Sequence, residues 1–212
     1  FHGDDSLYVN LFVPSSVKWR AKDAVLTQVT RFPEEPRTTL HWTLDRPVDG
    51  ALNLRHPRWS DDAVVLVNGE EAARSHAPGS YVEIRRMWQS GDTVELQLKM
   101  EVAVETAPAA PDIVAFTYGP LVLAGALGRD GLAPGSDIVV NERKFGEYND
   151  TPFTPPRIIG EPDTLAARMT AGPGPLEFTA TAADGGTIKM IPYHRIAHQR
   201  YATYWPVQHT AS

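Results

Sequence analysis

The sequence contains no cysteine among its 212 residues. Disulfides, thiolate zinc sites and cysteine nucleophiles are therefore excluded for this chain. The missing cysteine does not fix the cellular compartment, because secreted proteins can also lack it. A periplasmic or secreted protein stays among the options.

Long apolar runs and a basic surface are missing as well. No apolar run approaches the roughly 18 to 20 residues of a membrane span, so we expect no membrane partner. The formal net charge is −6, whereas a nucleic-acid groove needs clustered Lys and Arg. The nearest basic cluster, Arg85-Arg86, divides between the two faces of one predicted strand. We therefore expect no nucleic-acid partner.

The N-terminal segment Phe1–Asp5 has neither the positive nor the apolar region of a signal peptide. The sequence has no initiator methionine and continues at once into a predicted strand. We expect it to be part of a longer protein.

Short alternating segments bounded by Gly and Pro are what the sequence has in abundance. In one of them Leu40, Trp42 and Leu44 face one way, which is typical of a half-buried strand. Asn68-Gly69 is a strong hairpin signal after such a segment. Helical patterns are almost absent; residues 163–170 carry a weak one. These features predict an all-β protein built as an antiparallel β-sandwich. Strands are predicted at 7–13, 24–31, 38–44, 51–55, 63–67, 101–105, 113–118, 121–127, 137–140, 176–182, 187–191 and 201–205.

The most regular stretch is 79–100, in which two alternating segments flank Gln89-Ser90-Gly91-Asp92. The first alternates around Val82 and Ile84, the second around Val94 and Leu96. A turn with Gly91 at positive φ would join them. We therefore predict a β-hairpin here, with one wet and one apolar face on its second strand.

The composition changes at residue 128, after which Gly and Pro are dense as far as about residue 186. This run has little core of its own, whereas its flanks are good strand formers. We predict a first β-sandwich formed by residues 1–127 and completed by 187–212. Residues 128–186 would be a second, smaller β-rich unit inserted before the last strands. Trp205 would then pack beside strands from the first half of the chain, and both chain ends would belong to one domain.

Several motifs occur in an order that resembles the C-terminal β-sandwich region of family-127 glycoside hydrolases, the β-L-arabinofuranosidase family and its relatives. Singly each motif is weak, but together they cover nearly all of the chain. They are Leu7-Tyr8-Val9-Asn10-Leu11-Phe12, Leu54-Arg55-His56-Pro57-Arg58-Trp59, Val67-Asn68-Gly69, Gly79-Ser80-Tyr81-Val82, Arg86-Met87-Trp88 with Gly91-Asp92, Gly119-Pro120-Leu121-Val122, and His198-Gln199-Arg200-Tyr201 with Tyr204-Trp205.

The resemblance implies a division of labour in the parent protein. In that family an (α/α)6 barrel precedes the β region and holds a cysteine nucleophile, further cysteines and a glutamate around zinc. None of these residues has a counterpart here, so we predict no catalytic residue, no metal site and no cofactor in this chain. The helical barrel would be its partner, and the parent would release β-L-arabinofuranose from plant-derived glycans. The chain alone should be inactive.

Tryptophans are the residues that could contact a sugar directly. A β-sandwich usually places Trp in its core or at a domain interface, and we expect that for most of the five. Trp59 lies between Pro57 and Asp61-Asp62, a loop-like context. It is our candidate substrate-binding residue.

Other candidate residues favour ordinary structural roles. His194 and His198 have the four-residue spacing of a helical metal site, but Arg195 replaces the glutamate of the His-Glu-x-x-His motif. The adjacent acids in Asp4-Asp5, Glu34-Glu35 and Asp61-Asp62 point to opposite faces if extended, so loop charge is the simpler interpretation. A calcium site at Asp61-Asp62 is the functional alternative.

Three arginines beside apolar strands are unusual: Arg55, Arg86 and Arg200. We expect them to be buried or interfacial and paired with acids. A clamp for a carboxylate substrate is the alternative.

Two further functions stay open from the residues. The chain could be a free-standing carbohydrate-binding module, which an exposed coplanar aromatic pair would indicate. It could also be an interaction domain without a ligand. A large apolar patch would instead indicate a missing barrel partner.

Overall fold

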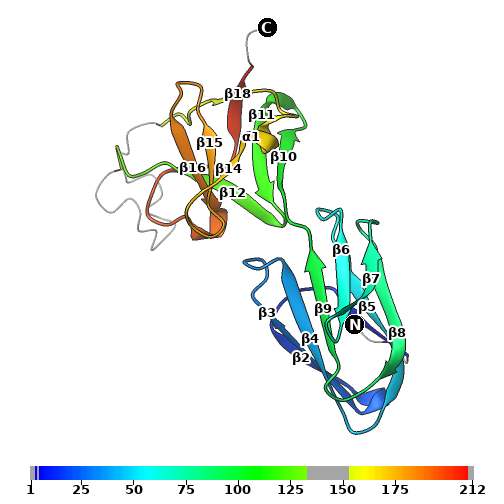
Figure 1. The fold of residues 1–212 in the computed structure, drawn as a ribbon. Coiled ribbons are helices and arrows are strands. Elements are labelled where there is room, and N and C mark those ends of the chain that lie inside the picture. The colour runs from blue at the N-terminus through cyan, green and yellow to red at the C-terminus, as the bar shows by residue number, and fades with distance from the viewer. Residues whose placement is uncertain (1–2, 4, 133–152, 210–212) are drawn as a thin grey trace. The chain divides into compact units, whose positions relative to one another are not determined.

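The computed structural model describes residues 3, 5–132 and 153–209, and nearly all of their regular elements are β-strands (Figure 1). The all-β prediction is confirmed. No helix in the described ranges is long and apolar enough to cross a membrane. The strand predicted at 137–140 lies outside the described residues.

The chain divides into two compact units, Phe1–Glu101 and Val102–Ser212. Each unit has a hydrophobic core made only of its own residues. The predicted division into 1–127 with 187–212, and 128–186, is therefore wrong. The strand 121–126 pairs with its neighbours on both sides within the second unit, so the change in composition at residue 128 falls inside that unit.

The first unit is a β-sandwich of two sheets, which share one core. A three-stranded sheet has the order β1-β5-β8, with β1 and β5 parallel. A six-stranded antiparallel sheet has the order β2-β3-β4-β9-β6-β7. The strands are β1 Ser6–Val9, β2 Ser15–Trp19, β3 Ala24–Thr30, β4 Arg37–Leu44, β5 Val48–Arg55, β6 Ala63–Val67, β7 Glu70–Ser75, β8 Tyr81–Trp88 and β9 Thr93–Leu98, with a 3-10 turn at Arg20–Lys22.

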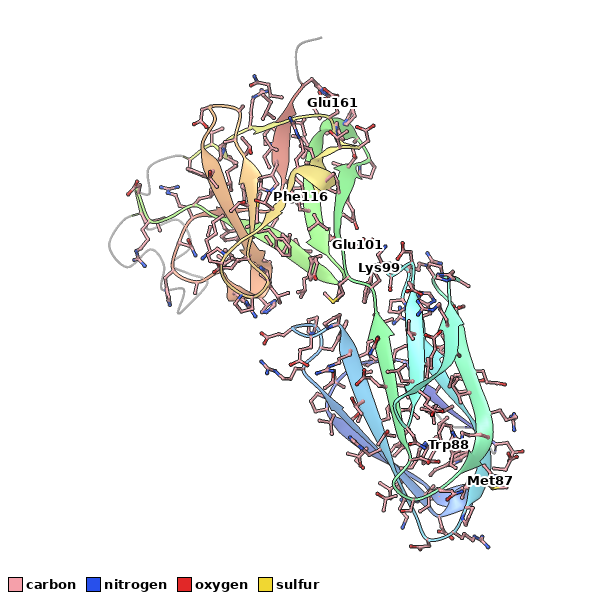
Figure 2. All side chains as sticks on the ribbon, viewed as in Figure 1. Met87, Trp88, Lys99, Glu101, Phe116 and Glu161 are labelled. Carbon is pink, nitrogen blue, oxygen red and sulfur yellow. The ribbon has the colours of Figure 1, made fainter. Side chains whose placement is uncertain are left out.

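Tryptophan rings fill the centre of this sandwich. The Trp42 and Trp88 rings stack with centroids 5.2 Å apart, and Trp19 lies 6.4 Å from Trp42. Trp88 is completely buried, while its neighbour Met87 on the same strand is exposed (Figure 2). Leu40 and Leu44 are buried beside Trp42, as the alternation predicted.

The predicted hairpin at 79–100 is wrong, although both of its strands exist. Strand β8 pairs with β5 in one sheet, and β9 pairs with β4 and β6 in the other. The segment 89–92 therefore crosses between the sheets. Its Gly91 N–H donates to the Trp42 carbonyl, and the Trp42 N–H donates to the Asp92 carbonyl. These bonds continue the pairing of β9 with β4 and draw the crossing segment toward the six-stranded sheet.

The predicted hairpin at Asn68-Gly69 is confirmed between β6 and β7. Both turn residues have positive φ, 53° for Asn68 and 86° for Gly69, as a two-residue hairpin turn requires. Strand β2 was not predicted, because four of its five residues are exposed and it shows no alternation.

The second unit is built on one sheet of nine strands. Strand β18 pairs with β11, and Trp205 lies opposite Val114. The last strands thus return to a strand from before residue 128, as expected, but both strands belong to the second unit. Its elements are β10 Val102–Ala107, β11 Ala110–Tyr118, β12 Leu121–Ala126, β13 Ile158–Ile159, α1 Leu165–Arg168, β14 Thr170–Ala171, β15 Phe178–Thr181, β16 Thr187–Pro192, the 3-10 turn η3 Tyr193–Arg195, β17 Tyr201–Ala202 and β18 Trp205–Gln208.

Candidate functional site

Trp59 lies in the loop after β5 and is partly buried. Its ring stacks on Phe32, with centroids 6.0 Å apart and planes 18° apart, and Phe32 packs edge-on against Phe12. One face of the indole is thus occupied by the protein. A sugar contact through the rest of Trp59 stays a prediction. The other four tryptophans are core residues, as expected: Trp19, Trp42, Trp88 and Trp205.

The predicted histidine and carboxylate candidates are dispersed. His194 lies in the 3-10 turn η3, and His198 has positive φ (53°), so the two share no helical face. Among the described residues, no group of three His, Asp or Glu side chains suits a metal ion. Asp61 pairs with Lys99 at 3.2 Å and Asp62 with Arg74 at 2.7 Å. The side chains of Lys99 and Arg74 therefore already pair with the proposed calcium ligands.

The remaining acidic pairs show the same behaviour. Glu35 lies 3.4 Å from Arg31 and 3.3 Å from Arg37, and Glu34 lies 3.8 Å from Arg31. In Asp4-Asp5, Asp4 lies outside the described residues, and Asp5 pairs with Lys22 at 2.6 Å. Exposed ion pairs of this kind contribute little to stability. They fit the interpretation as surface charge.

Arg55 and Arg86 are exposed, so the expectation of burial is wrong for both. Their place at an interface stays a prediction. The Arg86 guanidinium lies over the Trp88 ring at 5.5 Å from its centroid. Arg200 donates hydrogen bonds to the carbonyls of Asp130 and Gly131. Aromatic rings and backbone carbonyls, which the sequence pattern does not reveal, thus bind two of these arginines.

A groove in the first unit was not predicted. It encloses about 320 Å³ between the edge strands β1 and β2. The three-stranded sheet covers less than the whole six-stranded sheet, so part of the inner face of β2 stays open. Val17 points to this side because it lies opposite the buried Leu26. Four exposed apolar side chains line the groove: Tyr8, Leu11, Val13 and Val17.

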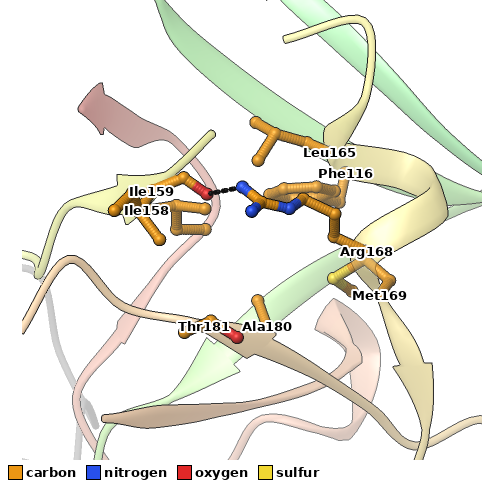
Figure 3. Close-up of a pocket in the computed structure, with 8 residues that line it drawn as sticks. All are labelled: Phe116, Ile158, Ile159, Leu165, Arg168, Met169, Ala180 and Thr181. Carbon is orange, nitrogen blue, oxygen red and sulfur yellow. Dashed lines mark hydrogen bonds between the residues drawn. The ribbon is translucent and has the colours of Figure 1, made fainter. Parts of the chain in front are cut away.

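The second unit contains a small cavity of about 90 Å³ beneath α1 (Figure 3). Its walls are mainly apolar, with Phe116 from the sheet and Leu165 from α1. The Arg168 guanidinium crosses its edge and donates to the Ile159 carbonyl at 2.9 Å. A cavity of about 150 Å³ is known to hold benzene, so this one admits only a few atoms. We interpret it as a packing gap.

His209 joins three segments of the second unit. Its Nε2 lies 3.0 Å from Asp112 Oδ1, and its Nδ1 lies 2.7 Å from Glu161 Oε2. The hydrogen bond to Asp112, and then that to Glu161, raises the pKa of His209, because both carboxylates stabilise the imidazolium. This stabilisation is complete below the unfolded pKa of about 6.5 and is lost as the pH rises through the raised folded pKa.

We therefore expect His209→Gln to lower the melting temperature of the second unit at pH 6 and to have little effect at pH 9. Melting curves of both proteins across this range measure the difference. The matched control is His41→Gln, which alters an exposed position on β4 in the first unit. This variant should not change the melting temperature of the second unit at either pH. A difference that stays constant from pH 6 to 9 would contradict the bridging role.

Comparison with known families follows the structural boundary. Residues 6–100 match the family model described as "Beta-L-arabinofuranosidase, GH127 middle domain". This match covers nearly the whole first unit, which is therefore similar to the GH127 middle domain. Residues 103–207 match a model described only as a domain of unknown function. The two matches meet at the boundary between the units, Glu101/Val102, and the predicted resemblance to family-127 glycoside hydrolases is confirmed.

Three solved structures with a similar fold are described as a glycoside hydrolase or as GH127 β-arabinofuranosidases. One, described as a glycoside hydrolase, aligns with TM-score 0.65 and 21% identity over 94% of this chain and 35% of its own. A GH127 β-L-arabinofuranosidase from Geobacillus stearothermophilus aligns with TM-score 0.63 and 20% identity, over 98% and 34%. A further GH127 β-arabinofuranosidase gives 0.61 and 21%, over 96% and 35%.

At these identities the likeness establishes the fold. The chain spans about a third of the length of these neighbours. Among the curated proteins compared, none matches the chain.

Proposed function

We propose that this chain is the non-catalytic C-terminal β-sandwich region of a GH127-type glycoside hydrolase, and that its first unit braces a helical catalytic barrel. The parent would cleave β-L-arabinofuranosides, and the barrel would carry the chemistry. The groove between β1 and β2, with its exposed apolar rim, is the observation that carries the proposal.

The groove has the character of a contact surface. Leu11 is 66% exposed and Val13 is 50% exposed, although both lie beside buried core residues. Contiguous exposed apolar side chains mark interaction sites more often than isolated ones do. Strands β1 and β2 are also edge strands of their sheets, and natural proteins usually cover such edges.

The residues of this chain do not fit the zinc site that the GH127 resemblance implies. That site uses cysteine ligands, and this chain has none. Its adjacent carboxylates are bound to Lys or Arg. A glycosidase instead needs two carboxyl groups held across the sugar, about 5 Å apart in retaining enzymes. The sequence thus supplies no thiolate, and the carboxylates of Asp61-Asp62 and Glu34-Glu35 already lie in ion pairs.

We expect the purified chain to show no turnover of a chromogenic β-L-arabinofuranoside, with or without added zinc. We also expect it to bind a separately purified GH127 helical barrel in sedimentation or calorimetric titrations. Turnover by the chain that is abolished by point changes within it would contradict the non-catalytic role. A failure to bind barrels, with no self-association through the exposed groove, would contradict bracing.

The groove can be tested with charge substitutions. Leu11→Asp combined with Val17→Asp should weaken barrel binding at least tenfold, because both side chains would become charged in an apolar contact. The control is Val29→Asp, which alters an exposed valine that points away from the core on β3. Equal weakening by the control and the double variant would exclude the groove as the contact.

A further inference from the structure

The second unit carries an exposed aromatic pair on the outer face of its sheet. Along β12, Leu123 and Gly125 face the core, so Val122, Ala124 and Ala126 face outward. Tyr201 lies opposite Ala126 in the pairing of β17 with β12. Directly opposed residues share a face, which places Tyr201 on the outer side.

Tyr193 reaches Tyr201 from the 3-10 turn η3 that follows β16. Their ring centroids are 5.4 Å apart, their planes are inclined by 53°, and their hydroxyl oxygens are 3.4 Å apart. The two rings are therefore tilted against each other, and their hydroxyl groups lie near each other. Tyr193 is 48% exposed and Tyr201 is 46% exposed. Nearly half of the surface of each residue is thus available to a ligand.

The outer face of β12 near the tyrosine pair carries small side chains. Ala124 faces outward yet has no exposed surface, so neighbouring atoms cover it. The turn η3 contacts β12 directly. Tyr201 lies on β17, and Tyr193 directly follows β16 in η3, so strands of the same sheet position both tyrosines. A pair positioned in this way loses little conformational entropy on binding a ligand.

The pair has the chemistry of a sugar contact. Tyrosine offers an apolar ring together with a polar tip, which matches the C–H face and the hydroxyl rim of a sugar. The hydrogen bond to Tyr193 raises the pKa of Tyr201, so its hydroxyl stays protonated. Half of two aromatic side chains amounts to roughly 200 Å², whereas a protein interface needs about 800 Å² from each partner. The size favours a small ligand.

We propose that Tyr193 and Tyr201 form a glycan-binding subsite in the second unit, which takes one neutral sugar residue of an oligosaccharide. The subsite lies outside the groove that would brace the barrel. Only the choice of a glycan as the ligand rests on the proposed function, since a glycoside hydrolase would meet glycans.

The test uses the whole chain and oligosaccharides derived from arabinan, xylan and galactan. We expect saturation-transfer NMR signals from at least one of them, and binding in calorimetric titrations. Tyr193→Ala and Tyr201→Ala should each reduce affinity at least tenfold. Tyr201→Phe keeps the ring and should lose less. Circular dichroism and melting curves of each variant verify that the second unit is folded.

The matched control is Tyr81→Ala in the first unit. Tyr81 is similarly exposed and also contacts a second tyrosine, Tyr8, with centroids 5.4 Å apart, so this variant should bind sugar normally. No transfer from any of the three sugars, or binding that survives both alanine variants, would overturn the proposal. Loss of barrel binding in Leu11→Asp/Val17→Asp should leave sugar binding unchanged, which separates the two proposals.

Discussion

Replacing Trp205 with alanine is expected to unfold the second unit at a lower temperature and to leave the first unit unchanged. Trp205 is fully buried on β18. Its ring reaches the backbone of Gly125, where an added Cβ would lie 2.3 Å from the ring. Removing so large a core side chain costs about 3–5 kcal/mol. For a unit of this size that loss lowers the melting temperature by more than about 10 °C.

Calorimetry can resolve the two units because each has a core of its own. We expect one transition to move in Trp205→Ala and the other to stay. Trp88→Ala leaves a cavity in the core of the first unit. In this variant the transition of the first unit should move, and that of the second unit should stay. Equal shifts of both transitions in either variant would show that the two units fold as one.

A second variant at the same site separates volume from polarity. The Trp205 indole N–H is buried without a hydrogen-bond partner among the described residues. Trp205→Phe removes this unsatisfied donor and keeps most of the ring, so we expect it to cost much less than alanine. If Trp205→Phe loses as much stability as Trp205→Ala, the second ring of the indole is indispensable for packing.

Local alternation predicted the buried faces of strands well. Leu40, Trp42 and Leu44 are buried because a period of two places them on the core side of β4. The hairpin at Asn68-Gly69 was predicted equally well, because Asn-Gly strongly favours a two-residue turn with both residues at positive φ. Predictions of this kind depend only on residues close in sequence.

Pairing partners could not be predicted in the same way. Residues 79–100 have the pattern of a hairpin, yet their two strands lie in different sheets. The pattern says which face of each strand is buried and nothing about its neighbour. The choice depends on bonds from residues 89–92 to Trp42, almost fifty residues earlier. The domain boundary was missed for a related reason, because it follows strand pairing and not the density of Gly and Pro.

The candidate surfaces depend on still longer-range facts. Tyr8 and Leu11 belong to a segment that resembles an ordinary buried strand. Tyr8 alternates with the buried Leu7 and Val9 and so faces away from the core, and Leu11 lies beyond the end of β1. Tyr193 and Tyr201 are eight residues apart, a spacing with no meaning by itself. They meet because β16 and β17 both pair with β12.

The segment that crosses between the two sheets of the first unit gives the second large effect. We expect Asp92→Ala to destabilise this unit by roughly 2–5 kcal/mol, because two donors lose their acceptor in a buried site. Asp92 is 8% exposed. Its Oδ1 accepts the Asn68 side-chain amide at 2.8 Å, and its Oδ2 accepts the Gln89 N–H at 2.9 Å. The carboxylate thus joins the crossing segment to the β6–β7 turn.

Denaturant unfolding of the first unit, followed by tryptophan fluorescence, measures the loss. Asp92→Asn keeps one acceptor oxygen but places an NH₂ group against the other donor, so an intermediate loss is expected. Asp61→Ala is the control, since this carboxylate is exposed and its one ion pair within the described ranges is with Lys99. The midpoint of this variant should barely move. If Asp92→Ala moves the midpoint no further than Asp61→Ala, the buried carboxylate does not hold the crossing segment. The bonds between that segment and Trp42 would then suffice to carry the chain from one sheet to the other.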